Sequence, residues 1–160
     1  MQYILDNGST IDDAIQCAYD FEIDGWGWHY FVGDANGNTA AISFIDGNVV
    51  VNQGADMPVP ALLNTRYDRE MELLNYYQGY GGSYPINIHD PKIPRFVRAA
   101  KMIEKYKPSQ NIVKYGMKML KDLRVNDDSE WSILFDIRKK GSPLQNTCEP
   151  KIKIVINVKN

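Results

Sequence analysis

The stretch that decides the fold is residues 28–52, WHYFVGDANGNTAAISFIDGNVVVN. Two turn signals, Gly33–Asn38 and Asp46–Gly47, interrupt its apolar segments. Glycine, asparagine and aspartate tolerate the positive φ angles of tight turns, and Asp-Gly is a strong hairpin signal. The stretch therefore predicts a β-meander. Its expected strands cover residues 28–32, 39–45 and 48–52.

A helix is predicted before the meander. Ser9 and Thr10 supply capping hydroxyls, and Asp12 and Asp13 place carboxylates in the first turn, where the helix dipole favours them. Apolar residues then recur at helical spacing on one face. They are Ile11, Ala14, Ile15, Ala18 and Phe21. We expect Asp24–Gly25 to end this element.

After the meander the pattern changes to helices. Pro58 and Pro60 break it first, and the apolar run Ala61–Leu63 is compatible with a short buried strand that ends at Asn64. Glycines and prolines predict a loop over 79–94. Helices are expected over residues 67–77, from Arg95 onward, and from the capping residue Ser109 to about Leu123.

Two further strands are expected near the end of the chain. Residues 131–137 are apolar, and residues 151–158 alternate isoleucine or valine with polar positions, the pattern of a half-buried strand. Residues 139–150 form a polar connection. The order of elements predicts an α+β fold with mainly antiparallel pairing and helices packed on the sheet. A length of 160 residues predicts a single domain.

Composition argues against nucleic-acid and membrane partners. Charged residues make up 24% of the chain, the net charge is −2, and no basic stripe stands out. The start of the chain lacks the basic and apolar regions of a signal peptide, and no run of about 18 apolar residues predicts a membrane span. We therefore expect a cytoplasmic location by default. The two cysteines, Cys17 and Cys148, do not imply a disulfide framework.

Common catalytic and cofactor motifs are absent from the sequence. His29 and His89 are isolated, and zinc needs three or four converging ligands, so we expect neither a metal nor a cofactor. No strand feeds the glycine-rich run at 79–82, which favours a loop over a phosphate cradle. The aromatic residues Trp26, Trp28, Tyr30 and Phe31 are compatible with a ligand platform or, as we favour, with sheet packing.

Asn64 and Arg95 are the candidate site residues. Asn64 lies between an apolar run and a helix, where a side-chain amide can face an oxyanion; a cap or a turn is the structural alternative. Arg95 follows Pro94 at a helix start, where a cation opposes the dipole. Its position therefore suggests a purpose other than helix stability, although an ion pair would also account for it.

Four segments carry a family resemblance. In order, they are WHYFVGDANGNTAAISFIDGNVVV, MPVPALLNTRYDREMELL, PRFVRAA and EWSILFDI. This succession, from about Gln2 to Ile137, resembles the choloylglycine hydrolases, a family of linear amide C–N hydrolases that includes bile salt hydrolases and penicillin V acylases. The resemblance implies the C-terminal portion of the αββα sandwich of Ntn (N-terminal nucleophile) hydrolases.

The resemblance also implies roles for the candidate residues. Asn64 corresponds to the asparagine that helps to form the oxyanion hole, and Arg95 to the arginine beside the nucleophile, whereas Arg98 corresponds to a structural helix position. The family's nucleophile is an N-terminal cysteine whose own α-amino group is the base. Neither Cys17 nor Cys148 has such a base beside it. We therefore expect a hydrolase fragment that is inactive alone and acts on N-acyl amides once the missing segment is supplied.

Two alternatives to a hydrolase fragment stay open. One is a non-catalytic remnant that binds an acyl or steroid-like ligand or another protein. The other is a half-fold that associates with itself, because removing upstream strands would leave sheet edges and apolar faces uncovered.

Overall fold

The structure, a computed structural model, describes residues 2–21, 27–125 and 152–154. These residues group into two compact units, one of residues 2–60 with 152–154 and one of residues 61–125. The single domain expected from the chain length stays a prediction. Of the expected elements, the strand over 131–137 and the helix end at Asp24–Gly25 lie outside the described residues.

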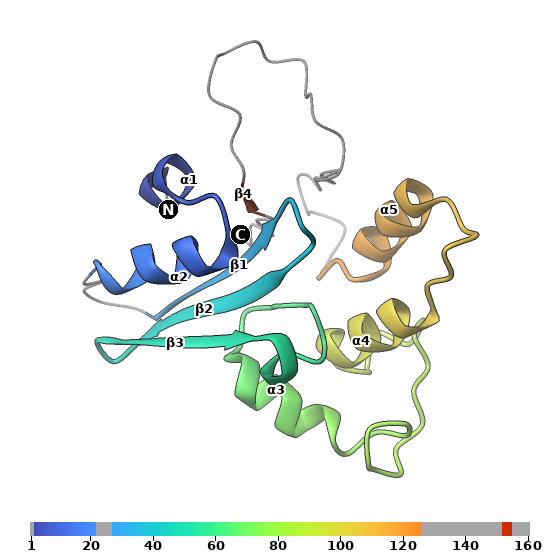
Figure 1. Ribbon diagram of the computed structural model, residues 1–160. Coiled ribbons are helices and arrows are strands. Elements are labelled where there is room, and N and C mark those ends of the chain that lie inside the picture. Colours follow the sequence, from blue (N-terminus) through green and yellow to red (C-terminus); the bar gives the residue numbers. More distant parts are fainter. Residues whose placement is uncertain (1, 22–26, 126–151, 155–160) are drawn as a thin grey trace. The chain divides into compact units, whose positions relative to one another are not determined.

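The first unit is a four-stranded antiparallel sheet in the order β3-β2-β1-β4. The predicted meander is present (Figure 1). Its strands are β1 (Trp28–Asp34), β2 (Thr39–Ile45) and β3 (Asn48–Gln53), and the short 3-10 helix η1 (Gly54–Asp56) follows. β4 (Ile152–Ile154) pairs with β1 and lies within the strand expected over 151–158.

Local turn chemistry sets the register of the meander. In the first turn the buried carboxylate of Asp34 accepts hydrogen bonds from the backbone and side-chain N–H groups of Asn38 and from the Asn36 N–H, each at 2.9 Å. In the second turn Asp46 and Gly47 both have positive φ, as the Asp-Gly pair predicted.

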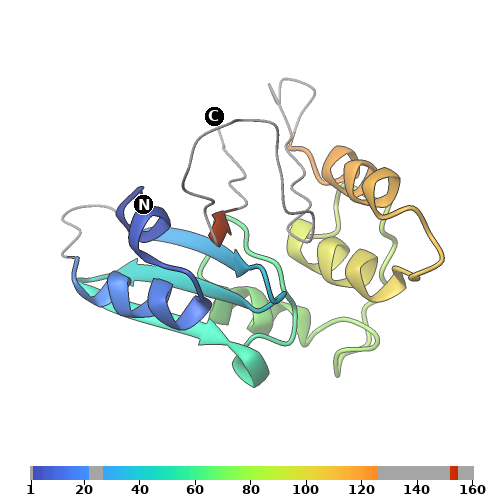
Figure 2. The same ribbon diagram turned by 45° about the horizontal axis from the view of Figure 1, so that its top comes forward.

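Two helices cover one face of this sheet (Figure 2). They are α1 (Gln2–Asn7), which the sequence did not predict, and α2 (Ile11–Tyr19). Thr10 and Asp13 form a capping box at the start of α2. The helices and strands share one apolar core. It consists of Ile4, Ile11, Ala14, Ala18, Val32, Ala40, Ile42 and Phe44.

The aromatic residues singled out near the start of the meander differ in how far they are buried. Tyr30 packs edge-to-face on Phe44, with ring centroids 6.0 Å apart, as ordinary sheet packing predicted. Trp28 is 54% exposed, so for this residue the packing interpretation is wrong. Trp26 lies outside the described residues.

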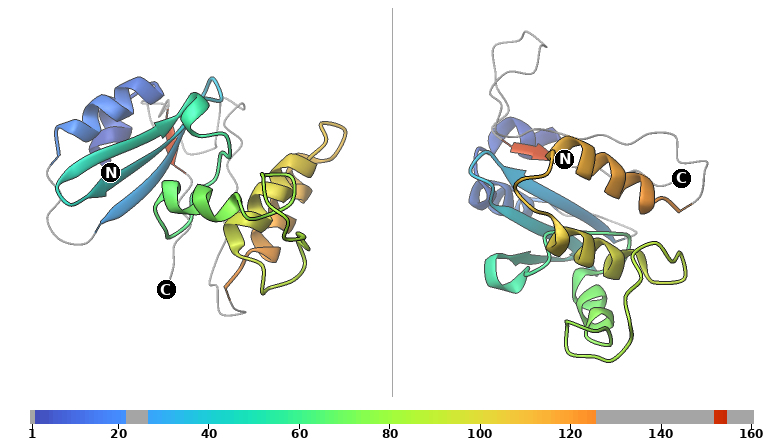
Figure 3. Two further views of the ribbon diagram at one scale, coloured as in Figure 1. Left: turned by 90° about the horizontal axis from the view of Figure 1, so that it is seen from below. Right: turned by 90° about the vertical axis from the view of Figure 1, so that its right-hand side faces the viewer.

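The second unit is helical (Figure 3). Its helices are α3 (Tyr67–Leu74), α4 (Arg95–Lys105) and α5 (Ile112–Asp122). Tyr67 of α3 and Phe96 of α4 are buried and meet edge-to-face at 5.9 Å. Ala61–Leu63 is not a strand but a half-buried irregular segment. The cap of α5 is Asn111, which accepts from the Lys114 N–H, and not Ser109.

Antiparallel strands with helices on the sheet confirm the α+β class. In the described part of the chain, no helix has both the length and the apolar character needed to cross a membrane.

Candidate functional site

Asn64 and Arg95, the two residues singled out from the sequence, line the same pocket of the second unit. The pocket has a volume of about 270 Å³. Asn64 belongs to the exposed turn before α3, and Arg95 is the first residue of α4. The remaining lining residues are Leu63, Thr65, Glu70, Leu73, Pro94 and Phe96.

Chain geometry brings these groups together. Pro94 has a φ of −51° and an extended ψ, and it starts α4 without a side-chain cap. Arg95 therefore stands in the first turn, where free backbone N–H groups disfavour a cation. Residues from the start of α3, including Glu70, line the same pocket as the Arg95 cation.

Glu70 is the acidic group of the pocket and is only 8% exposed. Burial raises the pKa of its carboxyl group above the ordinary value. A hydrogen bond with Thr65 and the positive charge of Arg95 act in the opposite direction. The net effect is a carboxyl group that holds its proton to a higher pH than an exposed glutamate.

Arg95 is half-buried, and burial is the main reason why its pKa is lowered. The like charge of Arg98 lowers the pKa of Arg95 further, whereas the charge of Glu70 raises it. The Arg95 Nε atom is buried and has no hydrogen-bond partner among the residues that the structure describes. This guanidinium therefore keeps hydrogen-bonding capacity for another group.

Arg98, one turn further along α4, also has a buried Nε without a partner among the described residues, but another of its nitrogens is engaged. It is 4% exposed, and its Nη1 donates to the Asp122 carbonyl oxygen at the end of α5 over 3.0 Å. This hydrogen bond joins α4 to α5 and is compatible with the structural helix position that the family resemblance implied for Arg98.

Sequence reasoning missed Glu70 and Thr65 as pocket residues. In the sequence, Glu70 stands near the start of the helix expected over residues 67–77. The spacing of Glu70 also indicates that it is buried. Tyr67, Glu70 and Leu74 lie three and four residues apart on one helix face, and all three are buried. A carboxylate on an apolar helix face indicates a buried ionisable group, and such groups are frequent at functional sites.

Other sequence candidates lie away from this pocket. Cys17 is half-buried in α2 and packs against the core of the first unit, whereas Cys148 lies outside the described residues. The glycine-rich run follows α3, not a strand, and the Gly82 N–H donates to the Tyr77 carbonyl oxygen. Within residues 2–21, 27–125 and 152–154, no three histidine, cysteine or acidic side chains form a group that could hold a metal ion.

The chain is similar to a penicillin V acylase of Pectobacterium atrosepticum, with 26% identity over 122 residues. The match covers 69% of this chain and 32% of the acylase, so the chain spans about a third of the length of the curated relative it matches. No family model matches the chain. No solved structure shows significant similarity to it. The acylase match supports a distant relation to the choloylglycine hydrolases, as the sequence segments suggested.

Proposed function

We propose that this chain contributes the oxyanion-binding side of a hydrolase that cleaves linear amide C–N bonds. The observation that carries the proposal is the shared pocket of Asn64 and Arg95. The similarity to a penicillin V acylase supports the same class of reaction.

In this proposal Asn64 and Arg95 have separate tasks. The Asn64 side-chain amide donates a hydrogen bond to the oxygen that becomes negative when the amide carbonyl is attacked. Arg95 lies beside the nucleophile, where its positive charge favours a thiolate over a thiol. Its buried Nε, without a partner among the described residues, supplies a donor for this purpose.

The nucleophile of the proposed reaction is an N-terminal cysteine supplied from outside these 160 residues. No cysteine is among the described residues that line the pocket, and Cys17 packs in the core of the first unit. The thiolate attacks the amide carbon, the amine leaves with a proton, and water then releases the acid from the thioester. The free α-amino group of the cysteine is the base.

The proposed substrates are N-acyl amides such as penicillin V or conjugated bile salts. A volume of about 270 Å³ lies just below the usual range for small-molecule sites. The pocket thus accommodates the reacting amide and its immediate neighbours, and the rest of the substrate is bound by residues from the missing segment.

For the fold, the proposal is a portion of an αββα sandwich. The first unit has one helical layer, α1 and α2, on one face of an antiparallel sheet, and such a pair of layers is half of the sandwich. Residues 1–160 would then belong to a single Ntn-hydrolase domain that a segment with the N-terminal cysteine completes.

A non-catalytic binding protein is the alternative. The observation that favours it is that the part of the chain that the structure describes contributes no cysteine to the pocket lining. Under this alternative the same pocket would bind an acyl compound without cleaving it.

The test begins with the polypeptide as its native source produces it. Its intact mass and N-terminal residue are measured, and its hydrolysis of penicillin V is followed by release of the free amine. The hydrolase proposal predicts a polypeptide heavier than 18.3 kDa that starts with cysteine and releases amine, or a partner chain that supplies that cysteine. Binding of penicillin V without amine release from a polypeptide of 18.3 kDa would establish the alternative.

A further inference from the structure

Charge is distributed unevenly along this chain. Residues 1–60 contain no lysine or arginine, so all 18 of these basic residues lie in residues 61–160. Residues 61–160 hold only 11 of the 20 acidic residues. Residues 1–60, which make up most of the first unit, are therefore strongly acidic, whereas basic residues prevail in the described part of the helical unit. A charge asymmetry of this kind bears on association rather than on the fold.

The outer face of α2 carries part of the acidic charge. The buried residues of this helix pack in the core of the first unit. Its exposed residues recur at helical spacing on the opposite face, and they are Asp12, Gln16, Tyr19 and Asp20. Tyr19 is 57% exposed. Among the described residues neither aspartate forms an ion pair within 4.0 Å.

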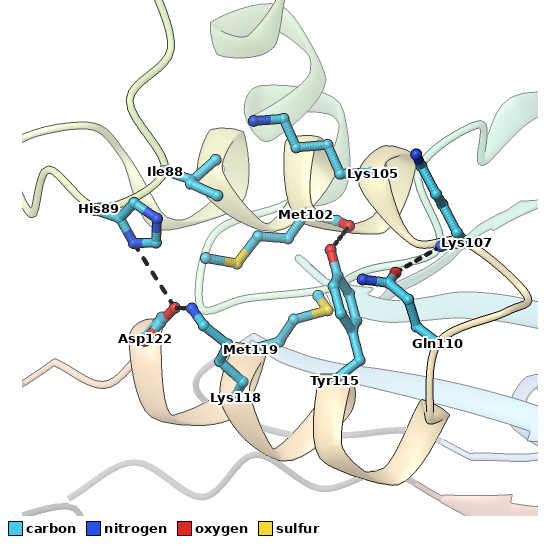
Figure 4. A pocket seen from close by; sticks show the side chains of 10 residues that line it. All are labelled: Ile88, His89, Met102, Lys105, Lys107, Gln110, Tyr115, Lys118, Met119 and Asp122. Atoms are coloured by element: carbon cyan, nitrogen blue, oxygen red, sulfur yellow. Dashed lines mark hydrogen bonds and ion pairs between the residues drawn. The ribbon is translucent and has the colours of Figure 1, made fainter.

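α5 faces α4 with only one of its sides (Figure 4). On this side the Tyr115 hydroxyl donates to the Met102 carbonyl oxygen at 2.5 Å, and the Met119 thioether lies between the two helices. Lys118 forms an ion pair with Asp122 beside them. No residue of α5 is buried. The other side of the helix is therefore left open by the described part of the chain.

This open side, the outer face of α5, consists of Val113, Lys114, Met117 and Lys121. Intervals of three and four residues relate Met117 to the other three, which places all four on one side of the helix. Val113 is 51% exposed and Met117 is 43% exposed. Both lysines are exposed, and neither forms an ion pair within 4.0 Å among the described residues.

We propose that the outer face of α5 binds the outer face of α2 in a second copy of this chain. Charge complementarity selects this partner, because one face carries two lysines and the other carries two aspartates. The spacing of the charges also agrees. Lys114 and Lys121 are seven residues apart, and Asp12 and Asp20 are eight apart, so about two helical turns, roughly 10 to 12 Å, separate each pair. Both lysine–aspartate pairs can therefore form at once across two adjacent helices.

The apolar side chains of the two faces complete this contact. Val113 and Met117 cover the exposed ring of Tyr19, which removes apolar surface of both copies from water. Since the two faces differ, each copy in the contact keeps one face free for a further copy. The assembly therefore grows with protein concentration, and it uses no residue of the pocket of Asn64 and Arg95.

Sedimentation velocity of the 160-residue chain tests the proposal. We expect faster sedimentation at about 0.01 M than at about 1 M ionic strength, because the Debye length shortens from about 30 Å to about 3 Å. Lys114→Glu/Lys121→Glu should weaken the association on the order of tenfold, since each exposed charge pair contributes a few-fold in affinity. Identical sedimentation of the parent chain at both ionic strengths would overturn the proposal.

Charge exchange between two variants tests whether the partner is a second copy. Asp12→Lys/Asp20→Lys should also associate weakly. An equal mixture with the α5 variant should regain the association, because the reversed α5 of one chain meets the reversed α2 of the other. No recovery in the mixture, with the helical circular dichroism of both variants intact, would overturn the proposal. Asp12 stands in the first turn of α2, where a lysine opposes the dipole, so Asp20→Lys mixed with single reversals of either lysine repeats the exchange.

The matched control is Lys105→Glu/Lys107→Glu. It makes the same change in net charge at two exposed lysines outside α5. This control should sediment like the parent chain at low ionic strength. A loss of association equal to that of Lys114→Glu/Lys121→Glu would overturn the proposal, because the effect would then reflect net charge alone.

Discussion

The buried carboxyl group of Glu70 and the guanidinium of Arg95 line one pocket from the first turns of two different helices. Burial acts on both groups against their charged forms, raising the pKa of Glu70 and lowering that of Arg95. Their opposite charges partly offset these effects. The effect of burial on the pKa of Glu70 can therefore be tested by substituting this residue.

Glu70→Gln should make stability less dependent on pH. Because the folded-state pKa of Glu70 is raised, its protonated form contributes stability that is fully present below its ordinary value of 4.5. This contribution is lost as the pH rises through the folded-state pKa. Urea unfolding between pH 4 and pH 7 should therefore show a flatter profile for Glu70→Gln than for the parent chain.

The control for this measurement is Glu72→Gln on the same helix, where the side chain is 62% exposed. Its profile should follow that of the parent chain. Parallel profiles for Glu70→Gln and the parent chain would mean that burial does not perturb Glu70.

Arg98→Ala should destabilise the helical unit by about 2 kcal/mol, because it removes a charged hydrogen bond and the packing of a buried side chain. The hydrogen bond that this substitution removes joins Arg98 Nη1 to the Asp122 carbonyl oxygen at 3.0 Å. Arg69→Ala, at a side chain that is 63% exposed, should leave stability nearly unchanged. Urea denaturation measures both, and similar values would refute a structural role for Arg98.

Features held by interactions between residues close in sequence could be predicted, whereas features held by residues far apart in sequence could not. The meander was predictable because its turns are encoded by residues adjacent in the chain, such as Asp34 with Asn38 and Asp46 with Gly47. The start of α2 was predictable for the same reason, since Thr10 and Asp13 cap it locally.

Features that depend on distant residues were missed. α1 has no acidic residue in its first turn and no basic residue in its last, and Ile4 is buried through packing against α2 and the sheet. The hydrogen bond between Arg98 and Asp122 joins residues 24 positions apart, so no local sequence pattern predicts it. In the candidate site, Asn64 and Arg95 could be singled out from sequence motifs. Glu70 lies in the same pocket because α3 packs on α4, which the sequence does not show.

Self-association through β3 is a further prediction. β3 stands at one edge of the described sheet, and its Val50 is 37% exposed. Unpaired edges recruit other strands, and a lysine on an edge blocks such pairing. We expect the isolated chain to sediment as a dimer and Val50→Lys to shift it toward monomer.

Val50→Thr, which retains a β-branched side chain without adding charge, is the control and should stay dimeric. A parent chain that sediments as a monomer at high concentration would contradict association through this edge.

We propose that Asn64 stabilises the oxyanion of amide hydrolysis, and this role can be measured directly. The most direct measurement is kcat for penicillin V hydrolysis by the proposed complete enzyme, with its N-terminal cysteine supplied, carrying Asn64→Ala. The control variant is Asn75→Ala, at an exposed residue outside the pocket. We predict a loss of about 10²- to 10³-fold for Asn64→Ala, the usual effect of removing one oxyanion-hole donor, and little change for the control. Equal kcat values for the two variants would contradict the claim.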